Sequence, residues 1–186
     1  MKKVLPWIFF TLILATALHL IDMWYLPGKK TKETVDGIYK RRGSWQINKI
    51  GYGGLRFAGT DTVVRDNPDT VTSFAVYDVS EKPLKVRCVI PEGDNYWSLS
   101  LFAWNTDNYF VRNDRTAKSK EFDLVIVKKG SKYQQQGNEE VVVSPSDKGI
   151  FLIRMIVTNR DDKDELARLA EVQKKTTIEL IENVQY

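Results

Sequence analysis

Four short segments rich in aspartate and asparagine hold most of the side chains that could do chemistry in this sequence. They are residues 66–70, 94–96, 105–109 and 112–115. Their carboxylates could serve as the acid and base of a hydrolase acting on a glycan or lipid-linked substrate, or as oxygen ligands for Ca²⁺. They could instead line a polar cleft for a sugar, with Trp104 or Tyr109 as a stacking face. The third interpretation is turn formation, because such side chains bond their own backbone.

Hydrolysis places a geometric condition on these segments. The carboxylates available are those of Asp69, Asp94, Asp107 and Asp114. Two of them would have to converge to about 5 to 9.5 Å in one cleft. Dispersed carboxylates, each bonded to its own turn, would leave binding as the function.

Other chemistries are excluded by the residues that the chain lacks. The single histidine, His19, lies in an apolar N-terminal segment, so the rest of the chain has no imidazole for a Ser-His-Asp or Cys-His site, or for zinc or iron. Cys88 is the single cysteine and alternates with apolar neighbours, which favours a core residue over a nucleophile. No phosphate-binding loop is present, since the glycines at 53–54 indicate a turn or bulge. We therefore expect no cofactor and no metal. These residues leave open whether the protein is an enzyme, and they favour a protein that is not one.

The first 28 residues predict a transmembrane anchor. The run from Val4 to Leu26 is apolar with few interruptions and has the length of a spanning helix, about 20 residues. Trp7 and Trp24 are 17 residues apart, about 26 Å along a helix, which suits rings at the two membrane interfaces. The alternative is a signal peptide cleaved after Ala17, which would leave an unfavourable apolar mature terminus.

The charge distribution bears on partners and on orientation. The net charge of +4 comes mainly from a basic linker, residues 29–44, next to the anchor. That position suits anionic lipid head groups better than nucleic acid, so we expect a membrane partner and no nucleic acid. Taken literally, the positive-inside rule would keep the following domain in the cytoplasm.

The remaining chain, residues 45–186, predicts one mainly β domain that ends in a helix. Leu84, Val86, Cys88 and Ile90 alternate with Lys85 and other polar residues, as on a half-buried strand. Similar runs cover residues 70–79, 96–104, 122–128, 140–144 and 150–157. About seven to nine strands without helices between them indicate an antiparallel sandwich or jelly roll. Residues 161–182 predict a C-terminal helix capped by Asp161 or Asp162, and 31–42 a short helix in the linker.

Several motifs of this domain resemble a bacterial exported family known as domain of unknown function 1254. They occur in family order at residues 66–73, 77–84, 96–101, 107–110, 113–116, 122–127 and 143–145. Thr72 stands where the family signature usually has tyrosine, and Pro68 replaces an asparagine. The resemblance implies an antiparallel β-sandwich of jelly-roll type, and a short subgroup in which one domain follows an anchor in the inner membrane. It also implies export, which places the domain in the periplasm, against the positive-inside rule.

The polar parts of these motifs define the candidate site. The resemblance brings residues 67–70 and 112–115 to attention, and we predict that they lie together, with Arg115 and Asp69 as a charge-assisted pair. The first candidates are Asn67, Asp69, Thr70, Arg112, Asp114 and Arg115, and the weaker ones are Asp94, Asp107 and Tyr109. The function predicted is a membrane-anchored cell-envelope protein that binds a polar ligand, a glycan or a partner, with the hydrolase as the alternative. The oligomeric state stays open.

Overall fold

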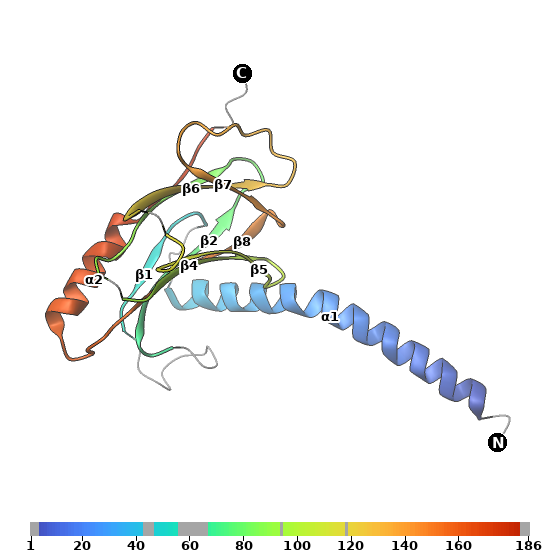
Figure 1. The fold of residues 1–186 in the computed structure, drawn as a ribbon. Helices are drawn as coiled ribbons and strands as arrows, with labels where there is room; N and C mark the ends of the chain where they lie inside the picture. The colour runs from blue at the N-terminus through green and yellow to red at the C-terminus, as the bar shows by residue number, and fades with distance from the viewer. Residues whose placement is uncertain (1–3, 43–46, 56–66, 94, 118, 183–186) are drawn as a thin grey trace. The chain divides into compact units, whose positions relative to one another are not determined.

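The computed structural model describes residues 4–42, 47–55, 67–93, 95–117 and 119–182 of the chain. The chain divides into two compact units, Met1–Gly43 and Ser44–Tyr186. The first unit is one helix and the second is a β-sandwich with a helix near its end (Figure 1).

Helix α1 (Leu5–Arg42) is a single continuous helix that contains Pro27. Its apolar part presents large side chains outward, with Trp7 70% and Trp24 84% exposed. The hydroxyls of Thr11 and Thr16 donate back to the carbonyls of Trp7 and Leu12, so these polar groups are satisfied within the helix. The helix is long and apolar enough to cross a membrane, a property that an N-terminal signal sequence shares.

The helix does not end at Pro27, where the sequence predicted the end of the anchor. Proline inside a helix removes one main-chain hydrogen bond and clashes with the carbonyl four residues earlier, which favours a kink or an end. In α1 the helix nevertheless continues past Pro27 to Arg42. Beyond Pro27, Lys32 pairs with Asp36 at 2.7 Å, one helical turn apart, which supports the helix there. The helix expected at residues 31–42 is therefore the continuation of the apolar part of α1.

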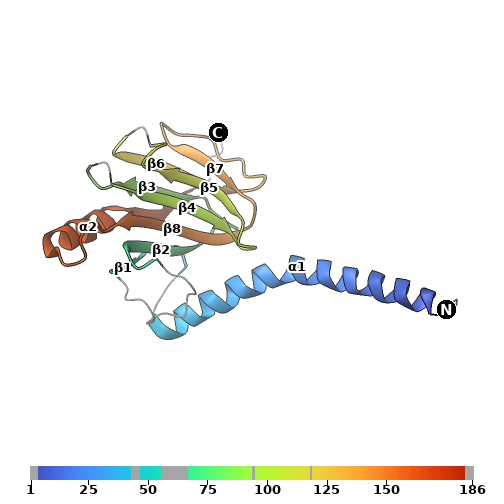
Figure 2. The ribbon, with the colours of Figure 1, turned by 60° about the horizontal axis from the view of Figure 1, so that its bottom comes forward.

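The second unit is a sandwich of two sheets, seen nearly face-on in Figure 2. The five-stranded sheet has the order β1 (Gly51–Gly53), β2 (Thr70–Asp78), β8 (Lys148–Ile156), β4 (Trp97–Ala103), β5 (Asn108–Asn113). The four-stranded sheet has the order β7 (Glu140–Ser144), β6 (Glu121–Lys128), β3 (Leu84–Val89), β9 (Thr177–Leu180). The predicted β-sandwich is confirmed, and all pairings are antiparallel among the described strands except β6 with β7.

The core lies between the sheets and follows the predicted alternation. On β3, Leu84, Val86 and Cys88 are buried, while Lys85 and Arg87 face outward. The opposite sheet contributes Leu99, Leu101 and Trp97 of β4, together with inward residues of β2 and β8. The predicted alternation of β3 is therefore confirmed.

The parallel pairing of β6 with β7 requires the chain to cross back over the sheet. Residues 129–139 make this connection, because β7 begins opposite Leu124 near the start of β6. Val125 and Val127 of β6 face away from the sandwich core, yet both are buried. The crossover therefore covers part of the outer face of the four-stranded sheet.

Helix α2 (Lys163–Lys175) is shorter than the predicted helix 161–182. The side chain of Asp162 caps its start by accepting from the amides of Asp164 and Glu165, as predicted. The helix ends at Thr176, whose buried hydroxyl accepts from the amide of Val89 at 3.2 Å. Residues 177–180 then pair with β3 as β9. The β-branched residues Thr176, Thr177 and Ile178 favour a strand over a helix at this point. The prediction of helix beyond Lys175 was wrong.

Candidate functional site

The two halves of the predicted polar cluster lie at the same end of the five-stranded sheet. β2 begins there at Thr70, β8 ends there at Ile156, and β4 begins there at Trp97. The amide of Asp114, just after β5, donates to the carbonyl of Trp97 at 3.3 Å. Two strands nevertheless stand between β2 and β5, so the backbones of the halves are separated by three strand spacings, about 14 Å.

The segment before β2 is a turn that satisfies its own backbone. The Asn67 side-chain oxygen accepts from the amide of Asp69 at 3.0 Å, and the Thr70 hydroxyl donates to the Asn67 carbonyl at 3.3 Å. The Asp69 carboxylate lies 3.9 Å from a guanidinium nitrogen of Arg160, and both side chains are partly exposed. This is the geometry of an Asx turn next to a surface ion pair.

The end of β5 and the turn after it hold two edges of the sandwich together. The Arg112 guanidinium pairs with the carboxylate of Glu140 on β7, donates to the carbonyl of Thr116 at 3.3 Å, and lies 5.6 Å from the centre of the Phe110 ring. Because β5 and β7 belong to different sheets, Arg112 links them at their edges. The exposed Arg115 closes the turn through its amide, which donates to the Asn113 side-chain oxygen at 3.2 Å.

The predicted pairing of Asp69 with Arg115 is therefore replaced by other partners in the described part of the chain. Asp69 lies near Arg160 and Arg112 is bound to Glu140. Thr70 is buried at the start of β2, and Asp114 is exposed. The six first candidates share one end of a sheet without converging in one cleft.

The weaker candidates are dispersed further. Asp107 lies in the turn between β4 and β5, where its carboxylate accepts from the Asn105 amide group at 2.7 Å. That turn is at the opposite end of β4 from Asp69 and Asp114, about 20 Å along the strand. Asp94 lies outside the described residues. The candidate carboxylates Asp69, Asp107 and Asp114 are thus dispersed along and across the sheet and do not share one cleft, as glycoside hydrolysis would require.

Tyr109 belongs to a group of hydroxyls inside the sandwich. Its hydroxyl lies 2.7 Å from that of Tyr77, which lies 3.0 Å from the hydroxyl of Ser144. Burial raises the pKa of both tyrosines, so they stay protonated and act as hydrogen-bond partners. The arrangement ties β2, β5 and β7 together, and it does not offer Tyr109 as an exposed stacking face.

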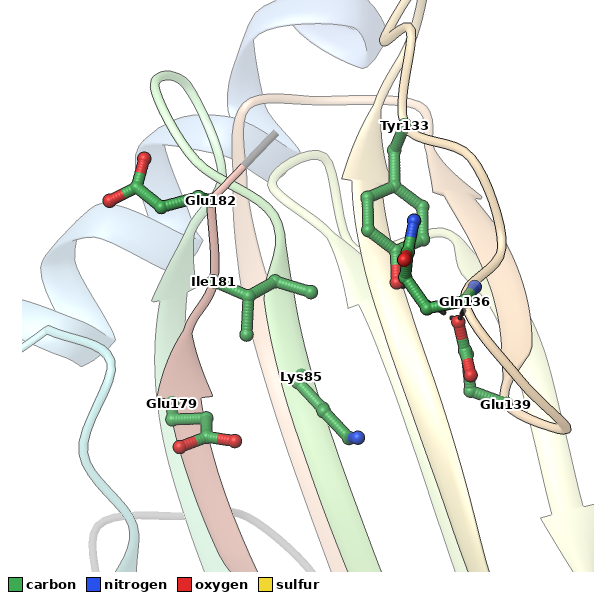
Figure 3. A pocket seen from close by; sticks show the side chains of 7 residues that line it. All are labelled: Lys85, Tyr133, Gln136, Glu139, Glu179, Ile181 and Glu182. Carbon is green, nitrogen blue, oxygen red and sulfur yellow. Dashed lines mark hydrogen bonds between the residues drawn. The ribbon is translucent and has the colours of Figure 1, made fainter. Parts of the chain in front are cut away.

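A pocket that sequence reasoning missed lies on the outer face of the four-stranded sheet. Its volume is about 240 Å³. Figure 3 shows Lys85 of β3 between two walls, one from the crossover and one from β9 and the residues after it. The crossover wall consists of Tyr133, Gln136 and Glu139, and the other of Glu179, Ile181 and Glu182.

Glu139 is the buried acid of this pocket, with 7% of its surface exposed. Burial disfavours its charged form, but hydrogen bonds from the Gln136 and Glu139 amides and the Tyr133 hydroxyl, with the nearby Lys85, lower its pKa overall. Burial and the bond to Glu139 raise the pKa of Tyr133 to about 12. The pocket therefore contains a fixed negative charge held by neutral donors.

The surroundings of the pocket carry more negative than positive charge. Lys85 lies 3.0 Å from Asp123, and Lys82 is bonded to Glu182. Lys85 and Lys82 are thus each bound to one acid, and Glu139 and Glu179 are two further acids that line the pocket. Among the described residues, no three His, Cys, Asp or Glu side chains are arranged to hold a metal ion. The pocket is suited to binding a small polar or cationic group.

No motif could have revealed this pocket before the fold was known. Its residues come from three separate parts of the chain, near 85, 133–139 and 179–182. They meet because the crossover and β9 lie on either side of β3, and β9 itself was predicted as helix. The outward position of Lys85 was the one available signal.

A family model matches residues 47–179, described as a protein of unknown function (DUF1254). The chain belongs to this family. The region that matches the DUF1254 model includes all nine described strands except the last residue of β9. No curated protein matches the chain.

Two solved structures are similar to this DUF1254 chain. One is the VPA0106 protein from Vibrio parahaemolyticus, with a TM-score of 0.64 and 18% identity, covering 90% of this chain and 42% of that one. The other is an uncharacterized protein from Burkholderia cenocepacia, with a TM-score of 0.47 and 16% identity, covering 95% of this chain and 53% of that one. The chain thus spans about half or less of the length of either protein. At these identities the likeness to VPA0106 supports the fold alone.

Proposed function

We propose that this chain is a membrane-anchored protein of the bacterial cell envelope whose β-sandwich binds a ligand or a partner. In this proposal α1 crosses the inner membrane once and the sandwich stands on the periplasmic side. The apolar helix supports the anchor. The periplasmic side rests on the export that the family resemblance implies. The ligand is a polar molecule, such as a glycan, or a polar group of a partner.

The pocket over Lys85 is the observation that carries the binding role. It combines a buried carboxylate at Glu139, a donor and aromatic wall at Tyr133, an amide at Gln136 and an apolar wall at Ile181. The lining is mostly polar and charged, and the Ile181 side chain and the Tyr133 ring are its apolar parts. Convergent polar groups in a hollow are the part of a binding site that fixes a ligand's orientation. The volume of about 240 Å³ is below the roughly 300 Å³ at which pockets begin to enclose drug-sized ligands. It therefore suits one small polar group.

A thermal-shift experiment on the full chain in detergent tests this role. The probes are ethylamine, arginine amide, glucose and N-acetylglucosamine, each titrated separately. A probe that occupies the folded pocket raises the melting temperature in a saturable way, because it binds only the native state. The shift should be lost in Glu179→Gln, whose side chain lines the pocket, and kept in Glu171→Gln, an exposed carboxylate on α2. If no probe shifts the wild type, or if Glu179→Gln responds as the wild type does, the proposed role of the pocket is wrong.

A further inference from the structure

We infer that β9 and the pocket beside it form a docking edge for an extended segment of another protein, in which Lys or Arg alternates with apolar residues. The segment would add a strand to the four-stranded sheet next to β9 and place a cationic side chain over Glu179, toward the pocket. This rests on the proposed binding role and names the class of partner.

Among the strands that the structure describes, β9 has a neighbour on one side only. β9 ends the described sheet, with β3 as its neighbour. The Ile181 amide donates to the Pro83 carbonyl at 3.0 Å, which makes Pro83 and Ile181 a hydrogen-bonded antiparallel pair. Because such pairs alternate, Glu179 also bonds toward β3, and the N–H and C=O groups of Ile178 and Leu180 face the open side. These outward groups are what an added strand uses.

The side chains of β9 specify what the added strand should carry. Glu179 lies opposite Lys85 in the ladder and on the same outer face as the pocket. Leu180 lies opposite the core residue Leu84, so it faces inward, yet 48% of its surface is exposed. A partner residue across from Glu179 is thus best cationic, and its neighbour across from Leu180 is best apolar, since cross-strand neighbours contact directly.

Charge favours a cationic partner over a second copy of this chain. Around the pocket, Lys85 and Lys82 are already bound to Asp123 and Glu182, while Glu139 and Glu179 hold the remaining negative charge. Two β9 strands pairing with each other would bring their glutamates together on one face, and like charges in that position repel. A Lys or Arg side chain of a partner would instead neutralise the negative charge of Glu179, and its alkyl stem could lie along Ile181.

Fluorescence anisotropy with the full chain in detergent tests the inference. The probe is a short labelled peptide that alternates lysine with valine, and the matched control replaces each lysine with glutamate. The lysine peptide should bind in a saturable way that weakens with salt, because the charges are exposed. The glutamate peptide should not bind. Failure of the lysine peptide to bind overturns the inference, and equal binding of the two peptides overturns its charge rule.

Two variants locate the binding edge. Leu180→Pro removes an amide that faces the open side and leaves the ladder to β3 intact, as edge prolines do. We expect it to weaken peptide binding on the order of tenfold or more, a loss of about 1.4 kcal/mol, with an unchanged melting temperature. Glu179→Lys, at an exposed side chain, should do the same by charge. Wild-type affinity in both variants contradicts docking at β9.

The oligomeric state and the small probes separate the remaining outcomes. If the wild type sediments as a dimer and Leu180→Pro as a monomer, a second copy fills the edge and the cationic partner is wrong. If arginine amide or ethylamine stabilises the chain but the lysine peptide does not bind, the pocket function stands and the docking edge fails. If neither the small probes nor the peptide binds, both proposals fail.

Discussion

A Cβ atom on Gly149 would lie 2.1 Å from the hydroxyl oxygen of Tyr77, so the tyrosine ring occupies the space that any side chain at residue 149 would need. The two residues face each other on the adjacent strands β8 and β2. The same Cβ would come within 2.3 Å of the Phe102 carbonyl on β4. Glycine at this position allows the hydroxyl group of Tyr77 to reach Tyr109 and Ser144.

Gly149→Ala should therefore destabilise the sandwich by about 3 kcal/mol, at the upper end of the usual cost of overpacking. The clash involves backbone and a fully buried ring, so neither neighbour can move cheaply. Chemical denaturation of the full chain measures the change. Gly54→Ala is the matched control, since a Cβ there meets no atom within 4 Å. Equal stability of the two variants would contradict the close approach of Tyr77.

Truncation to alanine at Leu99 and at Lys85 should have different effects on stability, because one side chain faces the core and the other faces outward. Leu99 is fully buried in the core, and Leu99→Ala should cost about 2 to 4 kcal/mol. Lys85 faces outward and pairs with Asp123 at partial exposure, so Lys85→Ala should cost less than about 1 kcal/mol. Urea midpoints of both variants give the comparison. Similar losses in the two would mean that the register of the sheets is wrong.

Glu165 should contribute to stability in a pH-dependent way. Its buried carboxylate accepts from the amide and hydroxyl of Thr158 and from the amide of Asn159, at 2.8 to 3.0 Å. The Thr158 amide bond is the main cause that lowers the pKa of Glu165 below its usual 4.5, against the effect of burial. Because the folded-state value is the lower one, this stability is present above about pH 4.5 and is lost as the pH falls through the folded pKa.

Melting temperatures of Glu165→Gln and the wild type across the acid range measure this contribution. The variant should be about 1 to 3 kcal/mol less stable at neutral pH, since donors lose a charged acceptor. Its stability should also fall less steeply on acidification. Thr158→Val removes one of the three donors, so its stability at neutral pH should lie between those of the wild type and Glu165→Gln. An acid response identical to that of the wild type in Glu165→Gln would contradict the role of this carboxylate.

Cys88 should be inert in the native protein. It is buried on the inner face of β3, and burial raises the pKa of its thiol far above the usual value. A water-soluble disulfide reagent should leave it unmodified under native conditions and modify it fully in guanidinium chloride. Rapid native modification would place Cys88 at an accessible site instead.

The sequence predicts a strand well where every second residue is apolar and one face of that strand is buried. Lys85 and Arg87 alternate with core residues, so β3 was predictable, and Asp162 marked the start of α2. The strand β9 was missed because its β-branched signal covers only residues 176–178, directly after a helix-favouring run, and the strand forms by pairing with β3. The predicted pairing of Asp69 with Arg115 was not found for a similar reason. The order of the strands decides how close these residues come, and β8 and β4 lie between β2 and β5.

The candidate site shows the same limit. The polar motifs of residues 67–70 and 112–115 predict a site. The structure places them in turns and edge contacts at one end of a sheet. The pocket over Lys85 depends on the crossover 129–139, whose path follows from the parallel pairing of β6 with β7. Single-sequence alternation cannot distinguish parallel from antiparallel pairing, so this pocket could not be anticipated.

Protease accessibility combined with N-terminal sequencing tests the central claim, a sandwich held outside the cytoplasm by an uncleaved anchor. Cells expressing the full chain are converted to spheroplasts, treated with protease, and fractionated into membrane and soluble parts. In untreated membranes we expect an intact chain that begins at Met1 and resists carbonate extraction. In intact spheroplasts we expect the added protease to digest the sandwich. A soluble form beginning at Leu18, or a sandwich protected until the spheroplasts are lysed, would contradict it.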